Sequence, residues 1–332
     1  PIDWVLELQA GETYDIAEAI PTGWALADAS CNDGQGTADL AAGTLTGITV
    51  GADDDIICTF INTRLAAQIT LQKEWVDGAV DDTAALDVTG PSGTATATST
   101  SIGGNVVDNV NTAVLVELTG ETVVLSEVLG GVGDYTTSFS CDGVNTPTYT
   151  PGERTASLLI DFADVAVTCT YTNTLNTSQL TLQKAWVGGV AADTAELTAA
   201  GINGSTVATS IANGGDETDT TNTAFLTALV GETVDLSEVL GGTGSYTTSF
   251  SCSGASNAPD YTAGDTSATL LIDGADSDIT CTFTNAINTA QVTLQKAWVG
   301  GVAGDTAALD ATGANGSSTA TSTSNGGDET DT

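Results

Sequence analysis

The chain repeats itself with a long, fixed period. The motif T-L-Q-K-[EA]-W-V occurs three times, and its lysines, Lys73, Lys184 and Lys296, are 111 and 112 residues apart. No other lysine occurs in the 332 residues. A period of this length is the size of one domain. The sequence therefore predicts a row of similar domains rather than one large core.

Within one period, the residue pattern is that of a β protein. Short runs rich in Val, Ile, Leu and Thr alternate with Gly, Asn and Asp clusters, and no segment keeps a helical spacing of apolar residues. In the second complete repeat, which contains Lys184, strands are expected at 179–187, 194–199, 206–211, 223–229, 233–240, 246–252, 268–272 and 279–285. The polar segment 213–222 is expected to be a loop. About seven strands per period predict an all-β chain of tandem Ig-like or prealbumin-like β-sandwich domains arranged as a rod.

The domain boundaries follow from short joins without Pro- or Gly-rich spacers, which favour a semi-rigid rod. They give 1–66 as the C-terminal part of a split repeat, 67–178 and 179–290 as complete repeats, and 291–332 as the N-terminal part of a split repeat. The split follows because N-G-G-D-E-T-D-T at 325–332 matches 213–220 and G-E-T at 11–13 matches 231–233. Either the sequence is a window of a longer array, or the closing part of one molecule completes the opening part of the next. Both describe a head-to-tail fibre.

The six cysteines fall into three pairs of nearly constant spacing. The pairs are Cys31 with Cys58, Cys141 with Cys169, and Cys252 with Cys281. The chain has no histidine and no C-x-x-C spacing, so one disulfide per repeat is favoured over zinc. Disulfides indicate an oxidising, extracellular compartment such as the cell surface.

The charge excludes several classes of partner and activity. A net charge of -38 repels phosphate backbones and anionic lipid, so nucleic acid and membrane-surface partners are not expected. No run approaches the roughly 20 apolar residues that cross a bilayer, so no membrane insertion is expected either. Without histidine or a Gly-rich loop that opens a helix, we expect neither turnover catalysis nor a cofactor.

The lysine of each copy lies on the apolar face of its strand. Because side chains alternate along a strand, Lys184 faces the same side as Leu182 and Trp186. The same pattern places Lys73 with Leu71 and Trp75, and Lys296 with Val292, Leu294 and Trp298. We interpret the tryptophans as core residues that cover the lysines rather than as a carbohydrate platform. An unpaired ammonium is costly to bury, so it must be neutralised, paired or consumed.

Two further polar residues recur on apolar strand faces. Glu238 follows the alternating residues Val234 and Leu236, and Asn285 follows Phe283. The candidate site residues of the whole chain are the lysines Lys73, Lys184 and Lys296, the glutamates Glu18, Glu127 and Glu238, and the asparagines Asn62, Asn173 and Asn285.

A lysine on the first strand, a glutamate on a middle strand and an asparagine on the last strand resemble the CnaB-type and SpaA-like prealbumin-fold repeats of bacterial surface proteins and pilins. The resemblance covers the whole chain. It implies spontaneous isopeptide bonds between Lys184 and Asn285, assisted by Glu238. Equivalent bonds would join Lys73 to Asn173, assisted by Glu127, and Lys296 to Asn62, assisted by Glu18. The last bond would link neighbouring molecules if the subunits are separate, or would be internal to a longer array. In such a reaction a neutral amine attacks the asparagine carbonyl while the acid moves protons, and ammonia leaves.

Other interpretations remain open. The lysine and glutamate could form a buried ion pair with asparagine as a hydrogen-bonding neighbour. Many members of this family lack the disulfide, which could itself provide the mechanical lock here. The acidic clusters at 53–55, 216–219 and 273–278 could bind calcium, although a solvated loop is favoured and no metal is expected because no known ligand spacing appears. The resulting prediction is a structural subunit of an extracellular filament, pilus or stalk. The alternatives are the stalk of an adhesin and a calcium-binding surface module.

Overall fold

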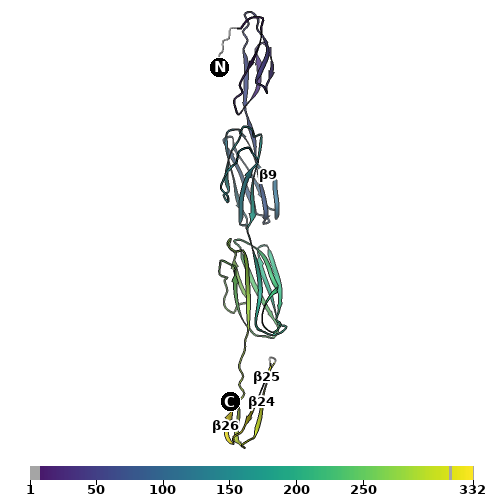
Figure 1. Ribbon diagram of the computed structural model, residues 1–332, viewed down its shortest axis with the longest axis vertical. Coiled ribbons are helices and arrows are strands. Elements are labelled where there is room, and N and C mark those ends of the chain that lie inside the picture. Colours follow the sequence, from purple (N-terminus) through teal and green to yellow (C-terminus); the bar gives the residue numbers. More distant parts are fainter. Residues whose placement is uncertain (1–7, 314–315, 332) are drawn as a thin grey trace.

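The computed structural model describes residues 8–313 and 316–331, and every regular element in these ranges is a β-strand. Figure 1 shows a rod with the opening residues at one end and the closing residues at the other. Its parts are here named the opening segment (residues 8–64), the first full repeat (66–175), the second full repeat (177–287) and the closing segment (288–331). The all-β, rod-like arrangement predicted from the sequence is confirmed.

The second full repeat is a sandwich of two four-stranded sheets, with strand orders β18-β15-β22-β20 and β17-β16-β19-β21. Its strands are β15 (Thr177–Gly189), β16 (Thr194–Gly201), β17 (Gly204–Ile211), β18 (Gly215–Leu229), β19 (Thr233–Gly241), β20 (Tyr246–Ser253), β21 (Ser267–Leu271) and β22 (Asp278–Ile287). Alternate residues are buried along these strands, as period-2 patterning requires. Leu182 of one sheet and Leu236 of the other belong to the same buried core.

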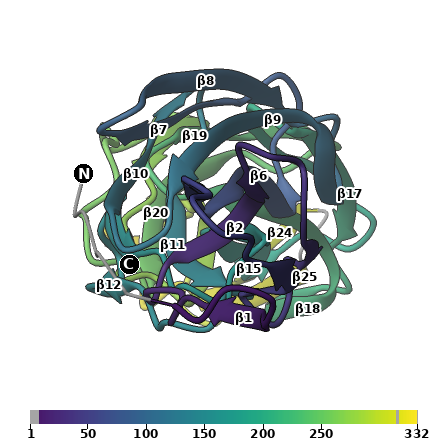
Figure 2. The same cartoon turned by 90° about the horizontal axis from the view of Figure 1, so that it is seen from above.

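The first full repeat has the same plan, with strand orders β11-β14-β6-β9 and β12-β13-β10-β7-β8. Its strands are β6 (Ala66–Gly78), β7 (Thr83–Gly90), β8 (Gly93–Thr100), β9 (Gly104–Leu118), β10 (Thr122–Gly130), β11 (Tyr135–Cys141), β12 (Thr148–Tyr149), β13 (Thr155–Leu159) and β14 (Ala166–Leu175). In both full repeats the first and last strands, β6 with β14 and β15 with β22, are parallel neighbours in the middle of one sheet. Figure 2, a view along the rod, shows the repeats superposed around a common axis.

The two end segments contain different parts of one repeat: the opening segment has its later strands and the closing segment its earlier strands. The opening segment contains β1 (Thr13–Ala17), β2 (Trp24–Cys31), β3 (Thr37–Asp39), β4 (Thr44–Thr49) and β5 (Cys58–Arg64). The closing segment contains β23 (Lys296–Gly301), β24 (Thr306–Gly313), β25 (Gly316–Thr323) and β26 (Gly327–Asp331). By the sequence repeat, β23 to β26 correspond to β15 to β18, whereas β5 corresponds to β22, the last strand of a full repeat.

Two sequence-based expectations about strands are wrong. The polar segment 213–222 is mostly strand, because β18 starts at Gly215 and its first half pairs with the end of β15, with Lys184 opposite Asp219. The second error concerns residues 288–295, which form no strand, although Val292 and Leu294 were expected on a buried face with Lys296. Val292 is 80% exposed. The corresponding part of β15 pairs with β22, whose counterpart β5 lies at the opposite end of the rod (Figure 1).

Short hydrogen-bonded joints connect the opening segment to the first full repeat and the first full repeat to the second. Leu65 donates its N–H to Gly23 O on one side of the first joint and accepts from Thr119 N on the other. Arg64 Nη2 lies 3.0 Å from Glu121 Oε1 across the same joint. At the next joint, Asn176 donates its N–H to Asp134 O on one side and accepts from Val230 N on the other. Because backbone groups of both neighbours are used, these joints restrict bending between the repeats.

Candidate cross-linking site

The second full repeat brings together the three residue types that the sequence singled out. Lys184 lies on β15, Glu238 on β19 and Asn285 on β22, and all three side chains are buried. Lys184 Nζ donates a hydrogen bond of 2.8 Å to Glu238 Oε2. Thr248 Oγ1 donates a longer bond, of 3.4 Å, to the other carboxylate oxygen. The site is therefore a charge-assisted pair in the interior of the sandwich, with a primary amide beside it.

Strand register accounts for this arrangement. In the parallel pair of β15 and β22, Lys184 is opposite Phe283 and Trp186 is opposite Asn285. Lys184 Nζ lies 3.4 Å from Phe283 O. Glu238 comes from the facing sheet, where Leu197 of β16 is its register partner. The lysine amine consequently lies between the two sheets and close to the last strand.

The asparagine amides are buried without hydrogen-bond partners. Among the described residues, neither Nδ2 nor Oδ1 of Asn285 has a hydrogen-bond partner, and the same is true of Asn173. Both side chains are fully inaccessible. A buried polar group left unpaired costs about 1–3 kcal/mol, so such groups call for an explanation.

The first full repeat has the same site with a looser ion pair. Lys73 Nζ lies 3.6 Å from Glu127 Oε2 and donates hydrogen bonds to Glu74 O at 3.0 Å and Tyr171 O at 3.2 Å. Within the part of the chain that the structure describes, neither carboxylate oxygen of Glu127 has a hydrogen-bond partner. Asn173 lies on β14, two residues after Tyr171 on the same face. Lysine, glutamate and asparagine are thus brought together in both full repeats.

Burial lowers the pKa of the lysine in both full repeats. Removal from water lowers the pKa of Lys184 to about 8, although the neighbouring charge of Glu238 acts in the opposite direction. Burial also lowers the pKa of Lys73 to about 8 against the charge of Glu127. Loss of hydration disfavours the charged amine, so a useful fraction is neutral near physiological pH. A neutral amine is the nucleophilic form of lysine.

The remaining site residues are divided between the ends of the rod. In the opening segment, Asn62 Nδ2 donates a hydrogen bond to Glu18 Oε1, while Glu18 Oε2 and Asn62 Oδ1 are buried without partners. In the closing segment, Lys296 is only partly buried, and its Nζ donates to Ala297 O at 3.0 Å. Figure 1 shows these segments at opposite ends of the molecule. The structure therefore brings Glu18 and Asn62 together but does not bring Lys296 to them.

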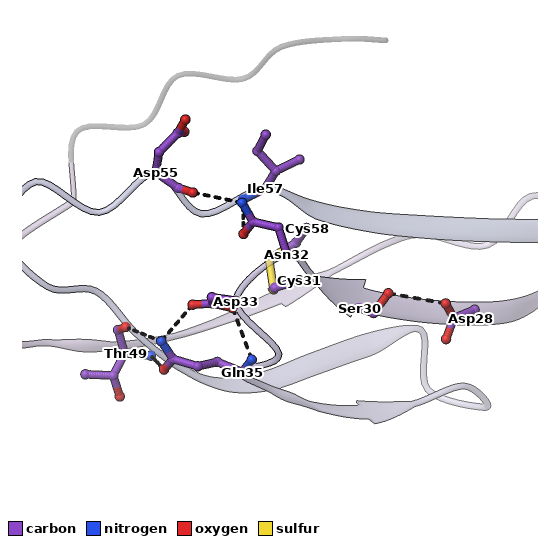
Figure 3. The surroundings of a disulfide bond; sticks show 10 residues. All are labelled: Asp28, Ser30, Cys31, Asn32, Asp33, Gln35, Thr49, Asp55, Ile57 and Cys58. Carbon is purple, nitrogen blue, oxygen red and sulfur yellow. Dashed lines mark hydrogen bonds between the residues drawn. A yellow bond between two sulfur atoms is a disulfide. The ribbon is translucent and has the colours of Figure 1, made fainter.

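Three disulfides join the cysteines in the pairs that the spacing predicts: Cys31–Cys58, Cys141–Cys169 and Cys252–Cys281. Each connects directly opposite residues of adjacent antiparallel strands. Around the first disulfide, the Asn32 side chain donates to Asp55 O and accepts from Ile57 N, which holds the loop before β5 (Figure 3). Each disulfide thus fastens the asparagine-bearing strand to one neighbour, and not to the lysine-bearing strand.

Sequence reasoning did not find the partners of the tryptophans. Trp75 and Trp186 are buried, as expected, and their indole N–H groups donate to Ser99 Oγ and Ser210 Oγ. Trp298 donates in the same way to Ser322. Each serine follows its tryptophan by 24 residues, and this constant spacing could have identified it.

Aspartates of two acidic clusters accept hydrogen bonds from backbone N–H groups. Asp276 accepts hydrogen bonds from Ser256 N and Asp273 N, and Asp219 accepts from Thr221 N and Asn222 N. Within the described ranges, no group of three or more cysteine, aspartate or glutamate side chains is arranged to hold a metal ion. The same ranges contain no helix of the length and apolarity needed to cross a membrane.

The fold defines a class of chain built from tandem two-sheet β-sandwiches, and both full repeats bury a lysine, a glutamate and an asparagine. The chain belongs to the family of prealbumin-like fold domains. Family models with this description match residues 5–64, 68–175 and 179–287. This confirms the tandem SpaA-like repeats expected from the sequence.

Solved structures with detectable similarity include pilins and adhesins. The major pilin T-13 of Streptococcus pyogenes is 13% identical, with 67% of this chain and 97% of that chain covered and a TM-score of 0.37. An adhesin of Mobiluncus mulieris, described as containing disulfide, isopeptide and ester cross-links, is 13% identical, with 67% and 100% covered and a TM-score of 0.31. A C-terminal fragment of the pilus adhesin SpaC of Lactobacillus rhamnosus GG is 13% identical, with 69% and 100% covered and a TM-score of 0.35. No curated protein matches the chain significantly.

Proposed function

We propose that the chain is a structural subunit of an extracellular filament, pilus or cell-surface stalk, in which disulfides and Lys–Asn isopeptide bonds lock each repeat. The observation that carries this proposal is the buried lysine–glutamate pair beside an asparagine amide with no hydrogen-bond partner, present at the same place in both full repeats. Membership of the prealbumin-like fold family supports a structural role. The disulfides support an oxidising compartment outside the cytoplasm.

The reaction proposed for the second full repeat balances without any cofactor. A proton passes from the Lys184 ammonium to Glu238, and the neutral amine attacks Cγ of Asn285 while the protonated acid polarises Oδ1. The Cγ–Nδ2 bond then breaks, and protons relayed through Glu238 convert the departing amide nitrogen to ammonia. The lysine ammonium and the primary amide become a secondary amide plus ammonia, and Glu238 keeps the proton that it accepted from the lysine. Lys184 and Asn285 are consumed, so the repeat performs one self-modification and no turnover.

The proposed bond lies on the path along which tension would pass. A pull along the rod enters the second full repeat through β15 and leaves through β22, which are parallel neighbours. A bond from Lys184 to Asn285 would carry that load, so the hydrogen bonds between β15 and β22 would not have to bear it. The disulfide Cys252–Cys281 joins β22 to β20 and therefore lies off this path. The two covalent links have different mechanical roles in this proposal.

The partner proposed for the end segments is another segment of the same kind. The opening segment has the acid and the amide, Glu18 and Asn62, and the closing segment has the amine, Lys296. Lys296 would bond to Asn62 of a head-to-tail neighbour, which is either a second copy or a continuation of the array. Such an open, head-to-tail contact produces filaments rather than closed rings. With a net charge of -38, the surface is not suited to nucleic acid.

Intact-mass spectrometry under reducing and denaturing conditions tests the cross-links. The chain is expected to be lighter than its sequence mass by two molecules of ammonia, one for each full repeat. Lys73→Ala and Lys184→Ala are each expected to restore the mass of one ammonia, and each variant serves as the control for the other. A chain with the full sequence mass would leave only buried ion pairs and would overturn the proposal.

A further inference from the structure

A tryptophan ring lies against each of the three lysine amines. The Nζ atoms are 4.5 Å from the ring centroid of Trp75, 4.7 Å from that of Trp186 and 4.6 Å from that of Trp298. Each tryptophan is two residues after its lysine on the same strand, so strand geometry places the ring beside the amine. An aromatic face within about 6 Å attracts an ammonium, and the attraction grows when water is excluded.

A buried serine on another strand fixes each ring. The indole N–H of Trp186 donates to Ser210 Oγ at 3.2 Å, and that of Trp75 donates to Ser99 Oγ at 3.1 Å. Both serines are fully buried. Ser210 lies on β17, in the sheet opposite the strand that carries Trp186, so the hydrogen bond spans the sandwich. The edge of Tyr246, with its ring centroid 5.3 Å away, restrains the same indole from another side.

The closing segment shows that this arrangement does not depend on the glutamate or the asparagine. There Trp298 Nε1 donates to Ser322 Oγ at 2.8 Å, and Lys296 Nζ keeps the same distance to the ring as in the full repeats. The strands that would bring Glu18 and Asn62 lie at the other end of the rod (Figure 1). The lysine strand and the neighbouring hairpin are therefore sufficient to place the amine on the indole.

We propose that Trp75, Trp186 and Trp298, each anchored by Ser99, Ser210 or Ser322, are positioning residues for the Lys–Asn cross-link. This inference rests on the proposed function. The indole face stabilises the ammonium while it loses its hydration and restricts the flexible lysine side chain to one direction. The amine is then in place when the acid and amide strands pack over it. The serine acts on the amine through the indole, from which it accepts a hydrogen bond.

The experiment follows cross-link formation during folding. The chain is synthesised and purified in denaturant, folded by dilution, and quenched at intervals. Cross-linked peptides of each full repeat are then counted by mass spectrometry. Variants at Ser210 and Trp186 alter only the second full repeat, so the Lys73–Asn173 bond in the same molecule is the internal reference. The time course is measured across a series of pH values around 8.

Ser210→Ala and Trp186→Phe, which both lose the anchoring hydrogen bond, are expected to slow the second cross-link by about tenfold relative to the first. Ser210→Thr keeps the hydroxyl and is expected to restore the rate. The pH at which the rate is half-maximal is also expected to fall in Ser210→Ala, because a poorly held ring stabilises the ammonium less. A purely structural contribution would slow the reaction equally at every pH.

Two results would overturn the positioning role. One is an unchanged rate in Ser210→Ala, and the other is a slower rate with no shift of the pH profile and no recovery in Ser210→Thr. If the wild-type chain still loses two ammonia molecules, either result leaves the proposed function intact. A wild-type chain that loses none overturns both the proposed function and this inference.

Discussion

Lys184 Nζ lies 2.8 Å from Glu238 Oε2, and both side chains have no exposure to solvent. A buried ion pair of this kind adds little net stability, because the loss of hydration offsets most of the attraction. The pair also leaves both polar atoms of Asn285 unpaired in the interior. Ion pairing alone therefore explains the arrangement poorly. Cross-linking accounts for both features, since it removes the buried charge and eliminates Nδ2 as ammonia.

Replacement of Glu238 tests whether Lys184 forms a cross-link or only a buried ion pair. Glu238→Gln keeps the size of the side chain but cannot accept a proton from Lys184, so the second cross-link is expected to be lost while the first forms normally. The chain should then be lighter by one ammonia instead of two. Because Lys184 then has no buried counter-charge, the unfolding free energy of the unreacted repeat should fall by about 3–5 kcal/mol. Deprotonation of Lys184 should reduce this loss. Glu127→Gln is the matched control, and loss of two ammonia molecules in either variant would contradict an essential acid.

The lowered lysine pKa predicts a pH dependence that can be measured without the cross-link. Burial lowers the pKa of Lys184 to about 8 in the folded repeat, against an ordinary value of 10.5, and Asn285→Ala, which cannot form the cross-link, is expected to keep this lowered pKa. Between these values the unfolded state binds more protons, so the unfolding free energy should rise with pH from about 8 to 10.5. The total rise should be on the order of 3 kcal/mol.

Urea unfolding at a series of pH values measures this rise. The control is the double variant Asn285→Ala with Lys184→Met, which removes the titrating amine and should show a flatter profile over the same window. Stability that falls as pH increases from 8 to 10.5 would mean that the folded repeat favours the ammonium, contrary to the direction given by burial.

The sequence determined the site better than it determined the strands around it. Lys184 could be placed inside because Leu182 and Trp186 share its face and strand alternation is rigid. The first half of β18 could not be recognised, since it is an edge strand with mostly exposed polar residues and therefore lacks apolar alternation. The hydrogen bond from Trp186 to Ser210 does not follow from residue alternation, because the two residues lie in opposite sheets, and only their constant spacing of 24 residues indicates it. Contacts between sheets depend on packing, which residue alternation does not specify.

The disulfides should stabilise the repeats independently of the isopeptide bonds. Cys252 and Cys281 are 29 residues apart, and a bridge over a loop of that length is worth about 3.5 kcal/mol in the chain-entropy account. In the Asn285→Ala background, Cys252→Ser with Cys281→Ser should therefore lower the melting temperature of the second full repeat by roughly 10–20 °C. Calorimetry measures the change. The corresponding pair of substitutions at Cys141 and Cys169 should affect the first full repeat instead.

Head-to-tail bonding predicts covalent oligomers with a defined polarity. At high concentration the 332-residue chain should form a ladder that survives reducing, denaturing electrophoresis. Lys296→Arg removes the amine and Asn62→Ala removes the amide, so neither variant should form a ladder alone. A mixture of the two retains one donor and one acceptor and should stop at dimers. Ladders in Lys296→Arg alone would show that another linkage joins the chains.

The position of the cross-link predicts how the rod responds to force. In wild-type chains pulled from their ends, the full repeats should not extend, because the load passes from β15 to Asn285 on β22 through Lys184. With Asn173→Ala and Asn285→Ala, both repeats should unfold as separate events. Reducing agent should lengthen each event by roughly 100 Å, since the disulfide loops span 28 and 29 residues at about 3.4 Å each. Single-molecule force spectroscopy measures both quantities. Equal extension of wild-type and variant chains would place the mechanical lock elsewhere than at the lysine.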